Sequence, residues 1–284
     1  MNNHVLATLK DDIIMGECTR WHDGRIWFAD WIKGAIYAVD DAGYSTTAIT
    51  LKSLPISFDW NNEGRCFVVN AGARRLQLLE NDQLTDFADL SAAPFPYNEI
   101  VIDDAGHIYI NNINFQFPGG EFQPGFIALV TPDGRVLRQE GDLAFPNGMV
   151  VTPDGKTLIC AESYNGKLTA FDIAPDGTLS NQRLWAHIEG QGGDGICVDA
   201  EGAIWASSGK RCVRIIEGGA VLDTVDLDRM AFACMLGGVD GKTLFIAANE
   251  WTGKIDPTGQ PVGFTRRRFK FPMPASPAVG DGGS

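Results

Sequence analysis

Six glycines, each in a short polar turn, divide this chain into units of similar length. The turns carry acidic or amide residues beside the glycine, and a short apolar run follows each one. Intervals of 39 to 49 residues separate the six glycines, which are Gly24, Gly64, Gly106, Gly155, Gly202 and Gly241. A repeat of about 40 to 45 residues with a strand pattern predicts a β-propeller.

Within each unit, runs of β-branched and aromatic residues alternate with Asp, Asn and Gly turns, which is typical of short strands. No segment shows sustained helical periodicity. We therefore predict an all-β fold, a six-bladed β-propeller with four-stranded blades. It would form a single domain over residues 1–275, followed by a disordered tail at 276–284. Residues 5–9 would supply an outer strand of the last blade, so that an N-terminal strand closes the ring.

The charge balance limits the partners of this protein. The chain of 284 residues has 23 basic and 36 acidic residues, a net charge of −13. A nucleic-acid surface would need a basic stripe, and an anionic membrane would repel such a chain. We expect a small-molecule substrate, no nucleic acid, no membrane, and a monomer or small homo-oligomer.

The six cysteines indicate a reducing compartment. None belongs to a C-x-x-C pair, and several lie in apolar strand runs, so buried free thiols fit better than a disulfide framework. The first residues contain no apolar signal core, and no run approaches the length of a membrane span. The sequence predicts a cytoplasmic protein.

Four oxygen-bearing residues occupy the same place in their repeats. Glu17, Asn98, Asn147 and Asp194 each precede the turn glycine by seven or eight residues. Ser57 and Cys234 take this place in the other two repeats. Equivalent positions of a propeller meet at one end of its central channel, so we expect the four to form one acidic cup.

Two carboxylates placed together would repel each other, and burial would make both costly. A divalent cation resolves this conflict. Because all four donors are oxygens, the set favours Ca²⁺, with Mn²⁺, Mg²⁺ or Fe²⁺ as alternatives, and the absence of His and Cys disfavours Zn²⁺.

Other motifs carry little weight. The segment 190–195 matches G-x-G-x-x-G, but a strand and not a helix follows it, which disfavours dinucleotide binding. The four histidines are scattered, so a Ser-His-Asp triad is not supported.

Three sequence segments resemble motifs of the senescence marker protein/gluconolactonase/luciferin-regenerating enzyme family. They begin at Gly16-Glu17, at Phe145-Pro146-Asn147 and at Gly193-Asp194. The resemblance covers nearly the whole chain. It implies a six-bladed propeller with one catalytic divalent metal, whose ligands fall on Glu17, Asn147 and Asp194, with the pocket Asn on Asn98.

One departure from the family pattern concerns the substrate. Sugar lactonases of the family carry R-x-N-D-G where this chain has Pro96-Tyr97-Asn98-Glu99-Ile100, so the sugar-binding Arg is replaced by Pro96. The aromatic residues expected around the pocket are Phe95, Tyr97, Phe115, Phe117 and Trp251. They favour a less polar lactone, although Arg20 or Arg74 could instead bring a guanidinium to the pocket.

The sequence thus predicts a metal-dependent lactonase, a carboxylic ester hydrolase. The metal would polarise the lactone carbonyl, and Asp194 would act as general base on a water or attack directly as a nucleophile. One alternative is hydrolysis of a phosphotriester or fluorophosphate in the same cup. Another is a non-enzymatic ligand-binding propeller with a structural Ca²⁺.

Overall fold

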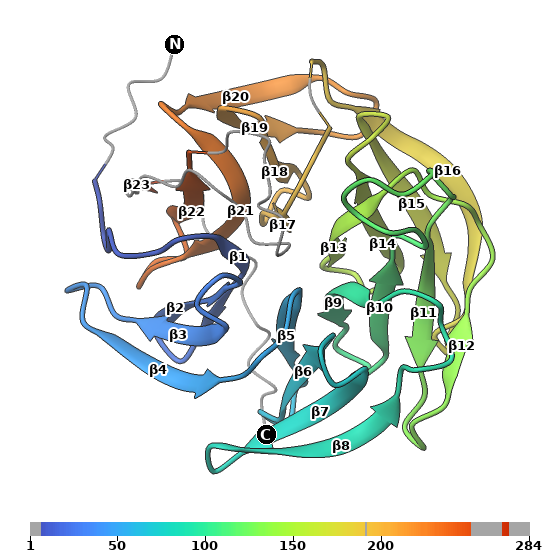
Figure 1. The fold of residues 1–284 in the computed structure, drawn as a ribbon. Coiled ribbons are helices and arrows are strands. Elements are labelled where there is room, and N and C mark those ends of the chain that lie inside the picture. The colour runs from blue at the N-terminus through green and yellow to red at the C-terminus, as the bar shows by residue number, and fades with distance from the viewer. Residues whose placement is uncertain (1–6, 191, 251–268, 273–284) are drawn as a thin grey trace, which may run out of the picture.

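The computed structural model of the chain describes residues 7–190, 192–250 and 269–272. Antiparallel sheets stand around a central axis, so the predicted all-β propeller is confirmed (Figure 1). Five sheets have the four strands expected of a blade, and the described residues of the last sheet contribute three.

The blades follow one another along the chain. Blade 1 contains β1 (Gly16–His22), β2 (Arg25–Asp30), β3 (Ala35–Val39) and β4 (Ser45–Thr50); blade 2 contains β5 (Ile56–Trp60), β6 (Cys66–Asn70), β7 (Arg75–Glu80) and β8 (Gln83–Asp89). Blade 3 contains β9 (Tyr97–Ile102), β10 (Ile108–Asn112), β11 (Phe126–Val130) and β12 (Val136–Arg138); blade 4 contains β13 (Pro146–Val151), β14 (Thr157–Glu162), β15 (Lys167–Ile173) and β16 (Leu179–His187). Blade 5 contains β17 (Ile196–Val198), β18 (Ile204–Ser208), β19 (Arg211–Ile215) and β20 (Val221–Asp226), and blade 6 contains β21 (Met230–Gly237), β22 (Thr243–Asn249) and β23 (Phe269–Pro272).

The first strand of each blade lies nearest the axis, and the fourth strand lies at the outside of the ring (Figure 1). Burial follows this order. All residues of β6, β10 and β11 are buried, whereas β4 and β8 are largely accessible. The hydrophobic cores lie between neighbouring blades: one joins blades 2 and 3, and another joins blades 5 and 6. Apolar contact between sheets therefore supplies the main stabilisation of the ring.

Packing between blades 6 and 1 completes the ring. Strand β1 contacts β21 and β22, and the Trp21 ring stacks on Phe245 with 5.4 Å between centroids. The strand predicted at residues 5–9 is not found where the chain is described, because residues 7–9 are irregular. Leu9 packs its side chain against the core near Ile13 and Phe245 instead of pairing its backbone. Residues 5 and 6, like the predicted tail, lie outside the described residues.

Two smaller expectations can be compared with the structure. All six cysteines are free and buried, as predicted. Among the described residues there is no helix with the length and apolar character needed to span a membrane.

Candidate active site at the propeller axis

Three innermost strands contain a β-bulge at the level of the expected ligands. In β1, Glu17 pairs with Ala29 and Arg20 with Trp27, so two residues lie opposite a single residue of β2. One of the two, Cys18, has a φ of 49°. Strands β9 and β13 show the same irregularity beside Asn98 and Asn147. Bulges re-aim side chains and are enriched next to active sites.

The bulge in β9 changes which residues reach the axis. Tyr97 pairs with Asn112 and Ile100 with Ile110, which leaves both Asn98 and Glu99 opposite Asn111. Asn98 and Glu99 are both buried. Regular strand alternation would send these two neighbours to opposite faces, so the sequence pattern predicted only Asn98 and missed Glu99.

Polar contacts connect the inner ends of blades 3, 4 and 5. The Asn111 side chain accepts a hydrogen bond from the Glu99 N–H (3.2 Å) and donates one to the Asn147 carbonyl (2.6 Å). The Asn147 side chain in turn lies close enough to Asp194 to lower the pKa of its carboxyl group. The Gly148 N–H donates to the Asp194 carbonyl at 3.2 Å. The structure therefore brings Asn147 and Asp194 together, although they are 47 residues apart in the sequence.

Three buried carboxylates, those of Glu17, Glu99 and Asp194, influence one another near the axis. Burial, together with the carboxylates of Asp194 and Glu99, raises the pKa of Glu17 well above its usual value. Burial and the Glu99 carboxylate do the same to the pKa of Asp194, while the Asn147 amide opposes the shift. Burial raises the pKa of Glu99 to about 7, against the opposing charge of Arg20. The site is thus strained by like charges when its carboxyl groups are ionised.

The chemistry of these residues fits a divalent cation. The Asp194 Oδ1 atom is buried and has no hydrogen-bond partner, which is an unusual and costly state for a carboxylate oxygen. A cation beside Glu17 and Asp194 would satisfy this atom and offset the repulsion. Within residues 7–190, 192–250 and 269–272, no group of three or more His, Cys, Asp and Glu side chains is arranged to hold a metal. The amide oxygens of Asn98 and Asn147 would therefore have to complete the ligand set.

The remaining two repeats do not add ligands. Ser57 is fully buried, and its hydroxyl donates to the Asn98 carbonyl at 2.7 Å. In blade 6 the prediction of Cys234 is wrong, because Cys234 pairs with Ile246, three residues before the end of β22, whereas Glu17 pairs with Ala29, one residue before the end of β2. The residue of blade 6 in the place of Glu17 is Ala231, which pairs with Ala248. A bulge before Ala233 shifts the register by one residue. The sixth position thus carries an apolar methyl group.

Five aromatic rings form a connected patch at the loops of blades 3 and 4. This aromatic patch consists of Phe115, Phe117, Phe122, Phe145 and Tyr164, with neighbouring centroids 4.7 to 6.5 Å apart. Phe117, Phe122 and Tyr164 remain 49%, 44% and 53% exposed. Such rings offer an accessible apolar surface. The sequence predicted Phe115 and Phe117 but missed the other three, which come from separate loops.

The aromatic patch is joined to the axial site by short connections. Phe145 precedes Asn147 by two residues and has a φ of 64°, a conformation that a bulky residue rarely adopts. Its carbonyl accepts the N–H of Ser163, the residue before Tyr164. The Ser163 hydroxyl also accepts a hydrogen bond from the Asn147 side chain at 3.3 Å. The patch is therefore anchored beside Asn147.

The other predicted substrate-binding residues have different places. Tyr97 is only 5% exposed and belongs to the core between blades 2 and 3, where its ring meets Phe126 edge to face. This corrects its assignment to the pocket wall, because the side chain that pairs opposite Asn112 faces the core. Phe95 is half-buried, and its carbonyl accepts a hydrogen bond from Asn112. Trp251 lies outside the described residues.

Neither of the two candidate arginines has an uncommitted guanidinium. Arg20 contacts Asp59 and Glu99 and donates to the carbonyls of Thr19 and Ile100. Arg74 donates to the carbonyls of Ser91, Ala93 and Pro94, so it supports the loop before β9. Neither Arg20 nor Arg74 therefore substitutes for the sugar-binding Arg that Pro96 replaces.

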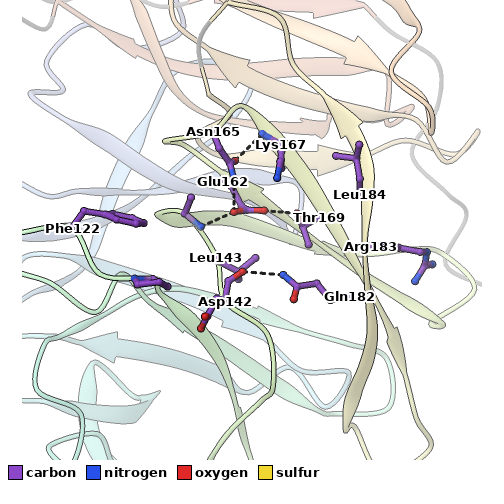
Figure 2. Close-up of a pocket in the computed structure, with 12 residues that line it drawn as sticks. Phe122, Asp142, Leu143, Glu162, Asn165, Lys167, Thr169, Gln182, Arg183 and Leu184 are labelled. Carbon is purple, nitrogen blue, oxygen red and sulfur yellow. Dashed lines mark hydrogen bonds between the residues drawn. The ribbon is translucent and has the colours of Figure 1, made fainter.

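A separate pocket of about 380 Å³ lies against blade 4 (Figure 2). Its wall includes Glu162, whose carboxylate accepts hydrogen bonds from the Ala144 N–H, Asn165 and Thr169. These three donors indicate a structural role for Glu162. None of Glu17, Asn98, Asn147 and Asp194 lines this pocket. We place the candidate active site at the axis, because the unsatisfied carboxylate and the strained charges are there.

Comparison with known families identifies the family of this chain. Residues 15–250 match the SMP-30/Gluconolactonase/LRE-like region. The chain belongs to this family. It is 26% identical to regucalcin of Gallus gallus, over 89% of this chain and 93% of that protein. It is also 31% identical to the diisopropyl-fluorophosphatase of Loligo vulgaris, but over only 37% of this chain and 41% of that enzyme.

Solved structures of the family support the fold assignment. The luciferin-regenerating enzyme superposes with a TM-score of 0.80 at 17% identity, covering 98% of this chain and 99% of that one. At this identity the likeness concerns the fold alone. Family membership nevertheless supports a hydrolase of the lactonase type.

The raised carboxyl pKa values predict how the metal-free protein responds to pH. A carboxyl with a higher pKa in the folded than in the unfolded state binds more protons when folded, so its contribution to the free energy of unfolding falls as pH rises. For Glu99 this loss should run from about pH 4.5 to about pH 7, at up to about 1.4 kcal/mol per pH unit. We expect Glu99→Gln to remove that part of the slope.

Urea unfolding at several pH values, in the presence of a chelator, measures the effect. The control is Glu63→Gln, because the Glu63 side chain is 74% exposed and should leave the wild-type profile unchanged. If the wild-type and Glu99→Gln curves run parallel from pH 4.5 to 7, the Glu99 carboxyl does not experience the environment described here.

Proposed function

We propose that this protein is a metal-dependent hydrolase that opens the ring of a lactone less polar than a sugar lactone. One observation carries the metal dependence: the buried and unsatisfied Oδ1 of Asp194, beside the similarly buried Glu17. Family membership supports the reaction class. The ion we expect is Ca²⁺, because every candidate donor is an oxygen.

In this proposal Glu17, Asn98, Asn147 and Asp194 hold the cation. When bound, it would act as a Lewis acid on the lactone carbonyl. Glu17 supplies charge, whereas Asn98 and Asn147 supply geometry without adding charge. The Asn147 amide favours the ionised form of Asp194, and that carboxylate either accepts a proton from the attacking water or attacks the carbonyl carbon itself.

The aromatic patch supports the apolar substrate class. A sugar lactone brings hydroxyl groups that need buried partners, and each unpaired group costs about 1–3 kcal/mol. Pro96 has no donor, and Arg20 and Arg74 are occupied. The rings anchored beside Asn147 would instead pack against a flat or aliphatic ring substituent.

A fluorophosphate or phosphotriester is the second candidate substrate. The partial similarity to the Loligo vulgaris diisopropyl-fluorophosphatase supports it. An oxyphilic metal with an adjacent carboxylate suits phosphoryl and acyl centres alike. A substrate panel containing aromatic, alkyl and sugar lactones and one fluorophosphate distinguishes the two reactions.

Removal of the metal should abolish hydrolysis, because the described residues of the axial cup include no nucleophile–histidine pair that could act alone. Activity is measured after prolonged dialysis against a chelator and again after adding Ca²⁺ or Mn²⁺. Restored turnover is the expected result. Full activity in the chelated protein would contradict the proposal.

Substitution of Asp194 by Asn should lower kcat by roughly 10³-fold or more, since it removes the proposed base or nucleophile. Asn98→Ala should cost far less, because it removes one of several neutral oxygens. Steady-state kinetics are compared with metal content for each variant. An Asp194→Asn protein that binds metal normally and stays within about tenfold of wild type would show that another group performs this step.

An aromatic or alkyl lactone should have a higher kcat/KM than gluconolactone. Phe117→Ser should lower kcat/KM for the aromatic lactone by roughly 5- to 30-fold, the equivalent of 1–2 kcal/mol of apolar contact, and change that for gluconolactone little. Tyr44→Ser is the matched control, because Tyr44 is 68% exposed on blade 1. A sugar lactone preferred by tenfold or more would refute the assigned substrate class.

A further inference from the structure

Four buried carboxylates lie on the innermost strands or directly before one, and they differ in their counter-ions. Glu17, Glu99, Asp194 and Asp59 all have raised pKa values that arise first from burial. Among the described residues, Arg20 is the positively charged side chain that contacts members of this group. Its Nε lies 3.3 Å from Asp59 and its Nη2 lies 3.9 Å from Glu99.

The bulge in β1 explains why a guanidinium occupies the axis. Glu17 and Arg20 are three residues apart in the sequence, but their partners Ala29 and Trp27 are only two apart in β2. Directly paired residues point to the same face, and so do residues two apart in a strand. Glu17 and Arg20 therefore lie on the same face of blade 1, with Arg20 in a layer that it shares with Asp59 and Glu99.

Arg20 is held firmly in this layer. Its side chain is 13% exposed, and its Nη1 and Nη2 donate to the carbonyls of Thr19 (2.9 Å) and Ile100 (2.5 Å). It thus reaches from blade 1 to blade 3. A guanidinium stays charged in proteins, so this cation is permanent.

The carboxylates consequently fall into two pairs. Asp59 has Arg20 and also accepts the N–H groups of Trp60 (2.9 Å) and Ile102 (3.0 Å), and Glu99 has Arg20. Glu17 and Asp194 have no contact with Arg20, and the Asp194 Oδ1 atom has no hydrogen-bond partner. The pair without a counter-ion is the pair that the proposed cation would join.

We propose that Arg20 is a built-in counter-ion that confines divalent binding to the Glu17–Asp194 end of the axis. The inference rests on the metal site of the proposed function and assigns a role to Arg20: its guanidinium takes the place of a second cation beside Asp59 and Glu99. Without Arg20, Asp59 and Glu99 would be buried oxygen donors lacking a positive partner. Such donors bind Ca²⁺, so their layer would take up a second ion.

Calorimetric titration of the chelator-stripped full chain with Ca²⁺ tests this proposal. Wild type and Arg20→Lys should bind one Ca²⁺. Arg20→Met, which keeps the length of the side chain without its charge, should bind two. The second ion should disappear in Arg20→Met/Asp59→Asn/Glu99→Gln. Circular dichroism establishes that each variant is folded, and a second Ca²⁺ is a readout that a merely structural role for Arg20 would not produce.

A second comparison does not require the loss of Arg20. Glu17→Gln should weaken Ca²⁺ binding far more than Glu99→Gln, because Glu17 is a proposed ligand of the cation, whereas Glu99 is paired with Arg20. Equal losses would overturn the proposal, as would one Ca²⁺ in folded Arg20→Met or two in wild type. No Ca²⁺ in wild type would overturn the proposed metal site as well, so failure of the inference alone is distinguishable.

Discussion

The innermost strands of neighbouring blades approach each other closely at the axis, and the candidate site depends on this constraint. Backbone hydrogen bonds cross between blades there: Gly148 donates to the Asp194 carbonyl and Gly195 to the Phe232 carbonyl. A Cβ atom at Gly148 would lie 2.6 Å from the Asp194 oxygen, and one at Gly195 would lie 2.7 Å from the Ala233 Cα. Glycine at these two positions is therefore a condition for bringing the polar side chains together.

Close packing buries these polar groups, and the bulges determine which way their side chains point. They turn Asn98 and Glu99 toward the axis and allow Glu17 and Arg20 to share a face. The result is a concentration of buried carboxylates for which one guanidinium compensates only in part. Buried charge is tolerated when it is paired. The unpaired carboxylates of Glu17 and Asp194 therefore favour a cation between them.

The two sides of the proposed reaction centre have contrasting surroundings. Toward the axis lie charged and amide groups, which suit a metal and a reacting carbonyl. Toward the loops of blades 3 and 4 lie the rings of the aromatic patch, which suit the apolar part of a substrate. Asn147 connects them, because its side chain contacts Asp194 and Ser163 while Phe145 precedes it by two residues. A lactone with an apolar substituent matches both surroundings at once.

The sequence by itself determined the repeat, the all-β fold and the positions of Glu17, Asn98, Asn147 and Asp194 within their repeats. These follow from local patterns, since turn glycines and apolar runs recur at a readable spacing. The tertiary structure decided what depends on register and on contacts between blades. The register of blade 6 placed Ala231 where the spacing predicted Cys234, and one-residue bulges added Glu99 and Arg20. Packing moved Tyr97 into the core and gathered Phe122, Phe145 and Tyr164 from separate loops. A bulge changes the facing of a side chain without changing the composition of its strand, and contacts between distant loops leave no periodic trace in the sequence.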